Sequence, residues 1–299
     1  MIHYLLQSSA DHPGLAEGVP PEGLLSAAER ERFESLGTAK RRRDWLLGRW
    51  TAKRLLQTTL RQQGCDLPLD ALEIRAAPDG APEVVLAHAA DGAPEVFVGQ
   101  RATQHSALST QHSALSTQYS LSISHSRGRA LCALSVGGGL AVGCDIELVE
   151  LRSPGFARDY FTEDERALLA GAPAEQRDTL VTTIWSAKEA ALKALRLGLT
   201  VDTRAVTCLP ELVPLAAGGA GGSQGGSAHQ PCGEGVWHPI AITTDPALLD
   251  RPDPCLRGWW RVAGDFALTL ASITSSQEGP GVRAAAPNRA GGLEGCALQ

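Results

Sequence analysis

The sequence lacks the features of a disulfide-bonded or membrane-spanning protein. Its seven cysteines are odd in number and scattered, and no two form a CxxC pair. This pattern argues against a disulfide framework or a structural zinc site. No stretch is apolar for long enough to cross a bilayer, and the first residues have neither the basic start nor the apolar run of a signal peptide. We therefore expect a protein of the reducing cytoplasm that does not contact membranes.

The sequence also lacks the charge and aromatic pattern of a nucleic-acid-binding protein. Its net charge is −6, although residues 29–61 contain ten Lys and Arg against four Asp and Glu. A run of this kind is most often a solvated helix face, but it also suits phosphates or an acidic partner. Because no aromatic residues are interleaved with the run Lys40-Arg41-Arg42-Arg43, nucleic acid is disfavoured.

What is present is an ordinary globular composition, with 43% hydrophobic and 20% charged residues in 299. That length suffices for one large domain or two small ones. Apolar residues at helical spacing predict a helical region, a glycine turn predicts a β-hairpin, and a further apolar run predicts a closing strand. The segments are a helical region over 22–63, a hairpin of 129–136 with 140–149, helices over 160–169 and 180–196, and a strand over 259–272.

Three other segments look like insertions or tails. TQHSALS occurs at 103–109 and again at 110–116, so His105 and His112 belong to repeated polar filler rather than to a site. The glycine-rich stretch 216–235 predicts a mobile loop. We expect an α+β fold with an N-terminal half (1–150), a C-terminal half (151–274) and a disordered tail (275–299).

Two acids lie close together in the apolar run GLAVGCDIELVE. Strand alternation buries Val142, Cys144 and Ile146 on one face and places Asp145 with Glu147 on the other. Two carboxylates this close repel unless a positive charge lies between them. Oxygen ligands suit Mg²⁺ or Mn²⁺. The alternative is a half-exposed strand whose acids face water.

A second group of charged residues lies in WSAKEAALKAL, residues 185–195. Glu189 lies at the edge of the apolar helical stripe, and Lys193 follows one turn later. They could be an ordinary surface pair. Lys188 argues against that view, because it falls inside the stripe and must be paired or reach a polar site. The third motif is Ser124-His125-Ser126, a cluster of donors suited to a phosphate.

Together the three motifs resemble the phosphopantetheinyl transferases, specifically the larger, surfactin-synthetase-activating type. The family pattern appears here as SHS (124–126), GCDIE (143–147) and WSAKEAALK (185–193), in the family's order. The resemblance covers about residues 22–272. It implies two pseudo-symmetric α+β halves, each an antiparallel sheet with helices, with coenzyme A (CoA) in the cleft between them. It also implies Mg²⁺-dependent transfer of phosphopantetheine to a serine of an acidic apo acyl or peptidyl carrier protein, by a monomeric enzyme.

The resemblance also implies roles for individual residues. Asp145, Glu147 and Glu189 would hold the metal, and Glu189 would accept the proton of the incoming serine. Lys193 would contact the pyrophosphate. The remaining CoA-binding candidates, on the same basis, are Arg32, Arg43, Arg49, Lys53, Ser124, His125 and Lys188.

The chain departs from the family pattern in one respect. The family commonly has Gly-Lys-Pro upstream of the Ser-His-Ser turn, whereas this chain has Gly80-Ala81-Pro82 and Gly92-Ala93-Pro94. The lysine is therefore missing, which predicts weaker CoA binding or compensation by an arginine. Two other functions stay open, a metal-dependent phosphohydrolase and a non-catalytic module that binds CoA or nucleic acid.

Overall fold

The structure is a computed structural model that describes residues 1–87, 118–212, 236–248, 255–274 and 297–298. The TQHSALS repeat with His105 and His112, the second Gly-Ala-Pro, the loop 216–235 and most of the predicted tail lie outside the described residues. The helices are α1 (Pro13–Glu17), α2 (Ala27–Glu34), α3 (Ala39–Gln62), α5 (Phe156–Tyr160), α6 (Glu163–Gly171) and α7 (Arg177–Ala194).

The described strands form two large antiparallel sheets and a small hairpin. One sheet has the order β11-β1-β5-β4, the other β6-β10-β9-β8-β7, and β2 pairs with β3. The strands are β1 (Ile2–Ser8), β2 (Leu72–Ala76), β3 (Pro82–Leu86), β4 (Tyr119–Ser126), β5 (Arg129–Val136), β6 (Leu140–Leu148), β7 (Val206–Pro210), β8 (His238–Thr244), β9 (Cys255–Ala263), β10 (Phe266–Thr274) and β11 (Ala297–Leu298).

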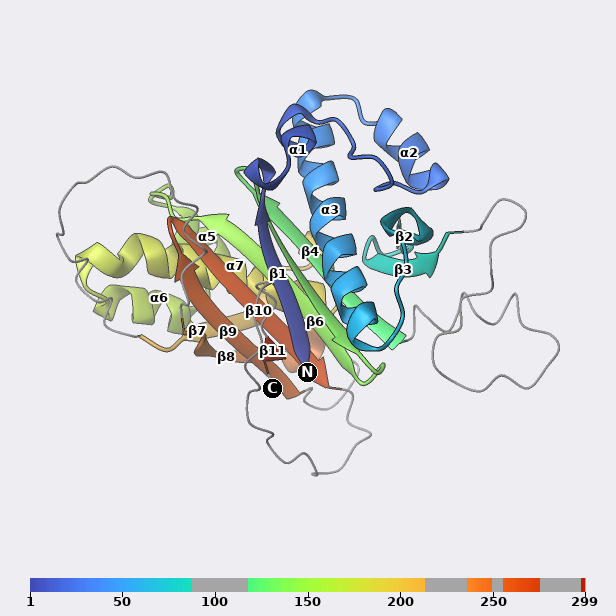
Figure 1. Ribbon diagram of the computed structural model, residues 1–299. Coiled ribbons are helices and arrows are strands. Elements are labelled where there is room, and N and C mark those ends of the chain that lie inside the picture. Colours follow the sequence, from blue (N-terminus) through green and yellow to red (C-terminus); the bar gives the residue numbers. More distant parts are fainter. Residues whose placement is uncertain (88–117, 213–235, 249–254, 275–296, 299) are drawn as a thin grey trace.

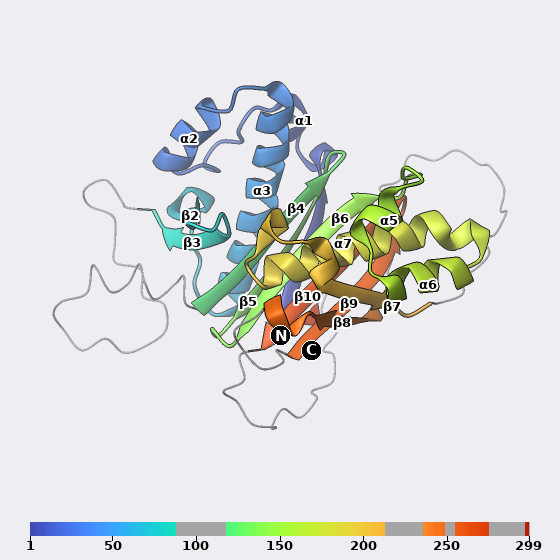
Figure 2. The same ribbon diagram turned by 180° about the vertical axis from the view of Figure 1, so that it is seen from behind.

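The molecule is layered, with the two large sheets between the two long helices (Figures 1 and 2). Helix α3 packs Leu55 and Leu56 on the β4–β5 face of the first sheet. The opposite face of that sheet packs on β6 and β10, with Leu131 against Cys144 and its neighbours. Helix α7 covers the outer face of the second sheet. This mixture of helices with antiparallel sheets agrees with the α+β prediction.

The predicted helical region over 22–63 contains two helices, α2 and α3. Helix α2 ends at Glu34, and Thr38 caps the start of α3 by accepting a hydrogen bond from the backbone N–H of Arg41 at 3.2 Å. Between them Leu36 turns into the core, where it is 7% exposed. The helices predicted over 160–169 and 180–196 correspond to α6 and α7, each with shifted ends.

Two of the strand predictions are wrong in their pairing. β5 and β6 follow one another through a glycine turn but do not form a hairpin, because β5 pairs with β1 and β4 while β6 pairs with β10. The Asp145–Glu147 strand thus belongs to the same sheet as β7, β8, β9 and β10. The single closing strand over 259–272 is the hairpin β9–β10, which turns at Gly264 with φ of 58°.

Serine hydroxyls join the edge strands of the two sheets. Ser120, Ser122 and Ser124 alternate along β4, and their Oγ atoms accept hydrogen bonds from successive outward-facing N–H groups of β6. The N–O distances are 3.0 Å to Val142, 3.0 Å to Cys144 and 3.4 Å to Ile146. We call these three residues the serine ladder. It fixes the register of β6 against β4 without any backbone ladder between them.

The long helices share a short sequence, Trp50-Thr51-Ala52-Lys53 in α3 and Trp185-Ser186-Ala187-Lys188 in α7. Both lysines are fully buried. Each pairs with a glutamate in the first turn of a shorter helix, Lys53 with Glu29 of α2 and Lys188 with Glu165 of α6.

Each glutamate also completes a capping box at the start of its own helix. One carboxylate therefore pairs with the lysine, caps the helix and accepts a hydrogen bond from a strand. Glu29 accepts from the N–H of Ser26 and, through its other oxygen, from Ile74 of β2 at 3.1 Å. Glu165 accepts from the N–H of Thr162 and from Cys208 of β7 at 2.7 Å. Such pairing satisfies charges that would be costly to bury alone. The same arrangement therefore connects α2, α3 and β2 at one place and α6, α7 and β7 at the other.

Among the described helices, none is long and apolar enough to cross a membrane. The five described cysteines are free thiols, and all of them except Cys255 are buried.

Candidate active site

The site forms where β6 passes under α7, and a glycine makes that approach possible. A Cβ on Gly143 would lie 1.8 Å from the backbone oxygen of Ala190 and 2.7 Å from the nitrogen of Ala194. Only glycine permits such contact between strand and helix. The face of β6 that the sequence predicted to carry the acids is therefore packed against α7, which brings Asp145 within reach of Lys193.

Asp145 is the most buried acid of the site, with 1% of its surface exposed. Its Oδ1 accepts hydrogen bonds from Ser124 Oγ at 2.6 Å and from Lys193 Nζ at 2.7 Å. Its Oδ2 is buried with no hydrogen-bond partner among the described residues. A buried carboxylate oxygen without a partner is unfavourable, and such groups mark a place for a ligand or ion.

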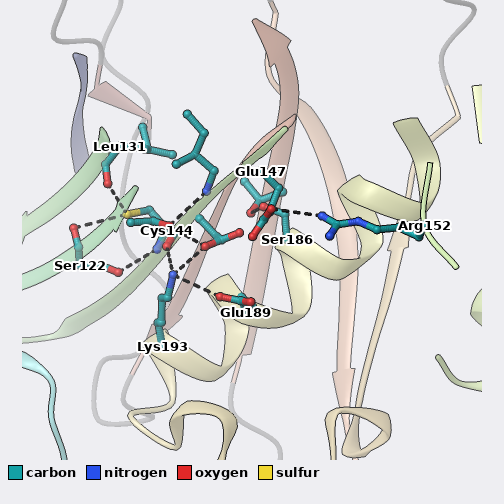
Figure 3. A network of polar contacts seen from close by, with 12 residues as sticks. Ser122, Leu131, Cys144, Glu147, Arg152, Ser186, Glu189 and Lys193 are labelled. Carbon is teal, nitrogen blue, oxygen red and sulfur yellow. Dashed lines mark hydrogen bonds and ion pairs between the residues drawn. The ribbon is translucent and has the colours of Figure 1, made fainter. Parts of the chain in front are cut away.

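Lys193 joins the strand to the helix (Figure 3). Its Nζ also donates to the backbone oxygen of Cys144 at 3.2 Å and lies 3.6 Å from Glu189 Oε2. Burial alone would lower the pKa of Lys193, but the carboxylates of Asp145 and Glu189 outweigh it and raise that pKa. Lys193 therefore keeps its positive charge at neutral pH.

Glu189 is the acid whose protonation is most perturbed. Burial, reinforced by repulsion from Asp145, raises its pKa to about 7, although Lys193 opposes the shift. A carboxyl group with this pKa exchanges a proton near neutral pH, which is what a general base or acid needs. Sequence order placed Glu189 one turn from Lys193, and the structure confirms that the two side chains meet.

Glu147 extends from the same strand but has a different partner. Arg152 approaches it from the side away from Lys193, with Nη2 at 3.2 Å from Oε2 (Figure 3). Burial and the neighbouring Asp145 raise the pKa of Glu147. The three predicted acids thus share one region and repel one another electrostatically.

The donor set fits a hard cation in its chemistry. It offers carboxylate oxygens, one of them without a partner, and mutual repulsion that a divalent ion would relieve. As they stand, however, the described His, Cys, Asp and Glu side chains form no group of three or more arranged to hold a metal ion. Instead the ammonium of Lys193 neutralises Asp145, and Arg152 neutralises Glu147.

A cavity beside the serine ladder contains two of the predicted CoA-binding residues. Arg49 and His125 line a space of ≈ 180 Å³ together with Trp45, Arg75 and the turn at Gly80. The guanidinium of Arg49 lies 4.7 Å from the Trp45 ring centre, and burial lowers its pKa despite Glu29 nearby. Ser124, which precedes His125 in β4 and does not lie in a turn, points to Asp145 instead.

The other predicted cationic residues have different surroundings. Lys53 and Lys188 are engaged by Glu29 and Glu165, and neither lines either of the two cavities of this region. Arg32 is exposed and donates to Ser35. Arg43 is exposed on α3 and lines neither cavity. For Lys188 the helical stripe correctly indicated burial with a partner, and that partner is a capping glutamate. Lys53, a candidate from the resemblance alone, is buried in the same way against Glu29.

A second cavity of ≈ 360 Å³ adjoins the first, and the two share Gly80, Pro82 and Ile123. It is lined by Lys193 and Arg196 at the end of α7 and by residues of β4, β6 and the 79–83 turn. Arg75 and Arg196, which line these cavities, were not singled out from the sequence. Arg75 had a local signal, since it is a positively charged residue shortly before the Gly-Ala-Pro turn, where the family commonly has a lysine.

Residues 141–215 match the family model of the 4′-phosphopantetheinyl transferase superfamily. The matched segment contains Asp145, Glu147, Glu189 and Lys193, together with Arg196. The match supports phosphopantetheine transfer in general, and with it a transferase activity. No match to the chain was found among curated proteins.

Proposed function

We propose that this protein transfers phosphopantetheine from CoA to a serine of an apo acyl or peptidyl carrier protein. The observation that carries the proposal is the position of Lys193, held between Asp145 and Glu189 inside the matched segment. A charged lysine beside repelling carboxylates suits a pyrophosphate, whose negative charge grows as the leaving group departs. The second cavity opens directly beside this lysine.

In the proposed reaction the carrier serine oxygen attacks the β-phosphorus of CoA. A new oxygen–phosphorus bond forms, the pyrophosphate bond breaks, and 3′,5′-adenosine bisphosphate leaves with the bonding electrons. Glu189, directly or through a water, accepts the serine proton, a role that its pKa of about 7 suits. Lys193 stabilises the charge that develops on the leaving phosphate.

Asp145, Glu147 and Glu189 are the proposed ligands of Mg²⁺, with Mn²⁺ as the alternative. When bound, the ion neutralises phosphate charge and supports the leaving group. The unpartnered Oδ2 of Asp145 and the raised pKa values of both glutamates favour this set. Lys193 pairs with Asp145, and Arg152 pairs with Glu147. For the ion to bind, these two cationic groups would have to move away from the carboxylates.

We further propose that CoA lies in a cleft between two pseudo-symmetric halves, as in the larger surfactin-synthetase-activating type. The repeated Trp-hydroxyl-Ala-Lys sequence with its capping glutamate supports the internal symmetry. Arg49 and His125 of the first cavity are the proposed partners of the 3′-phosphate. Lys53 and Lys188 would act indirectly, by holding the helices in place, and Arg32 and Arg43 would at most steer an acidic carrier.

The deciding experiment measures the intact mass of apo carrier proteins incubated with this protein, CoA and Mg²⁺. We expect a gain of one phosphopantetheine that EDTA abolishes and Mn²⁺ restores. Asp145→Asn, which keeps the side-chain volume, should prevent the gain. A mass gain that survives EDTA would contradict the metal role, and no gain with several fatty-acid, polyketide and nonribosomal peptide carriers would contradict the proposed reaction.

Arg49 offers a separate test of the CoA orientation. Arg49→Ala should raise KM for CoA while leaving KM for dephospho-CoA, which lacks the 3′-phosphate, nearly unchanged. Arg43→Ala is the matched control, because this arginine is exposed on the same helix and lines neither cavity. Equal effects of Arg49→Ala on the two substrates would remove Arg49 from the phosphate site.

A further inference from the structure

An arginine just after α7 forms ion pairs with two acids of the turn between β2 and β3. Arg196 Nε donates to Asp79 Oδ2 at 2.7 Å, and Arg196 Nη2 donates to Asp79 Oδ1 at 3.1 Å and to Glu83 Oε1 at 3.3 Å. The contact with Asp79 is bidentate, a geometry that adds specificity to an arginine–carboxylate pair. We call these contacts the Arg196 bridge. They join residues 117 and 113 positions apart, so they fix the turn relative to α7.

The two acids flank the part of the turn that lines the first cavity. Gly80 and Pro82 lie between Asp79 and Glu83 in the chain, and both line that cavity. Asp79 also shapes the turn itself, because its Oδ1 accepts a hydrogen bond from the backbone N–H of Ala81 at 3.0 Å. The guanidinium therefore holds the same carboxylate that sets the conformation of the turn, together with the acid that follows the turn.

The hairpin that contains the turn depends on contacts with the rest of the molecule. β2 and β3 form a sheet of only two strands, which is marginally stable by itself in water. Its strands are anchored by Leu72, Ile74 and Val84 in the core beside α3, and the N–H of Ile74 donates to Glu29. These anchors lie along the strands. At the turn, the contact with α7 comes from the Arg196 bridge.

The backbone at Arg196 shows that its side chain, rather than its backbone, accounts for an arginine at this position. Arg196 has φ of 59°, a left-handed conformation that disfavours residues with a Cβ. It follows the last turn of α7, where helices commonly end in glycine, which adopts this conformation without strain. A strained residue that makes a specific long-range contact is a candidate for a functional role.

We propose that Arg196, Asp79 and Glu83 are positioning residues for the 3′-phosphate end of CoA. This proposal rests on the proposed function, in which Arg49 and His125 of the first cavity contact that phosphate. By fixing the turn, the Arg196 bridge keeps one wall of this cavity in place. The bridge does not touch the reacting atoms, so CoA affinity depends on it and the chemical step does not.

The test measures Kd for CoA and for dephospho-CoA by isothermal titration calorimetry, in EDTA and without a carrier protein. Arg196→Gly and Asp79→Asn should each raise Kd for CoA by about threefold or more, the size expected for losing a partly exposed bidentate pair. Kd for dephospho-CoA, which lacks the 3′-phosphate, should stay nearly unchanged. Both variants preserve the local backbone, because glycine fits the left-handed conformation and asparagine can still accept from the N–H of Ala81.

Two further measurements separate positioning from a loss of stability. The double variant Arg196→Gly with Asp79→Asn should bind CoA no more weakly than Arg196→Gly alone, because both changes remove the same contact. In carrier modification followed by intact mass, the single variants should raise KM for CoA and keep kcat. A variant that only destabilises the fold would instead reduce the amount of active protein, and with it the apparent kcat.

Arg204→Gln is the matched control. Arg204 also forms a bidentate pair, with Asp202, in which its Nη2 lies 2.7 Å from Oδ2 and its Nε lies 3.1 Å from Oδ1. Its side chain is 56% exposed, close to the 48% of Arg196, but it lines neither cavity. Arg204→Gln should therefore leave both Kd values unchanged.

The possible failures are distinguishable, because the binding assay contains neither metal nor carrier. Wild-type protein that binds CoA but modifies no carrier overturns the proposed reaction. Wild-type protein that binds CoA no more tightly than dephospho-CoA overturns the placement of the 3′-phosphate, and the positioning role with it. Wild-type protein that passes both tests, but whose Arg196→Gly variant raises Kd for CoA by less than about threefold or weakens both ligands equally, overturns the positioning role alone.

Discussion

Helices α3 and α7 contain nearly the same five residues, WTAKR (50–54) and WSAKE (185–189), but they differ at the last. In α3 that residue is Arg54, whose guanidinium lies 5.5 Å from the Trp50 ring centre. In α7 it is Glu189, which lies beside Lys193 and the acids of β6. The shared lysine pairs with a buried glutamate in both places, whereas the residue that follows it is the proposed proton acceptor in α7 alone.

The comparison separates stability from function within one short motif. Lys53 and Lys188 are equally buried and have equivalent partners. The effect of replacing either lysine is therefore measured as a change in the free energy of unfolding. Glu189 and Arg54 occupy the same position after the lysine but face different surroundings. A variant at each of the four residues therefore reports on one role only.

The largest expected effect is on catalysis, from Glu189→Gln. If Glu189 accepts the serine proton and ligates the ion, kcat for carrier modification should fall by about 10²–10⁴-fold, as when a general base is lost. Arg54→Gln, at the equivalent position of α3, should keep kcat. Comparable losses in both variants, measured by intact mass over time, would show that the two positions act through folding rather than chemistry.

The next effect is on stability. Lys53→Met and Lys188→Met each leave a buried glutamate without its partner and should lower the free energy of unfolding by about 3–5 kcal/mol. Restoring neutrality with Glu29→Gln or Glu165→Gln should recover part of the loss in the matching double variant. Urea denaturation measures this, and a loss at only one of the two sites would show that the two pairs are not equivalent.

Two glycines sharpen the comparison between the helix–strand contacts. Gly143→Ala would force β6 from α7 and should cost about 1–3 kcal/mol or more, because the clash is with backbone. In α3, a Cβ on Gly48 would meet a methyl group of Ile123 at 3.1 Å. Gly48→Ala should change stability by less than about 1 kcal/mol, since alanine favours the helix. Thermal denaturation of both variants checks the difference.

The smallest effect concerns pH in metal-free protein. Because the folded state raises the pKa of Glu189 above that of an ordinary glutamate, it binds the proton more tightly than the unfolded chain does. The free energy of unfolding should therefore fall as pH rises from 4.5 to about 7. Glu189→Gln should flatten this slope, and Arg54→Gln should not. Urea titrations with EDTA at several pH values give the slope, and an unchanged slope in Glu189→Gln would assign it to another group.

The sequence predicts local elements well where the pattern is local. The helices α6 and α7 and the strands β5 and β6 are found in the structure close to where the sequence predicts them. Pairing is different, because alternation identifies a strand without naming its neighbour. A glycine turn between two strands suggested a hairpin, but β6 pairs with β10, more than a hundred residues later.

The site shows the same division. Asp145, Glu189 and Lys193 were predicted from their motifs, and the structure brings them together. The partner of Lys188 was not predictable, because Glu165 belongs to a different helix and its own sequence signal is that of a capping box. Arg196 was missed for a similar reason, since its left-handed backbone and its contact with Asp79 exist only in the fold.

The serine ladder has a consequence for how the protein behaves before and between its reactions. An edge strand presents unpaired N–H groups that can recruit a strand from another molecule, a common start of aggregation. In β6 the N–H groups of Val142, Cys144 and Ile146 are occupied by hydroxyls of the same chain. The serine ladder thus gives the second cavity a polar lining, and it occupies the N–H groups of β6 that could otherwise pair with a strand of another molecule.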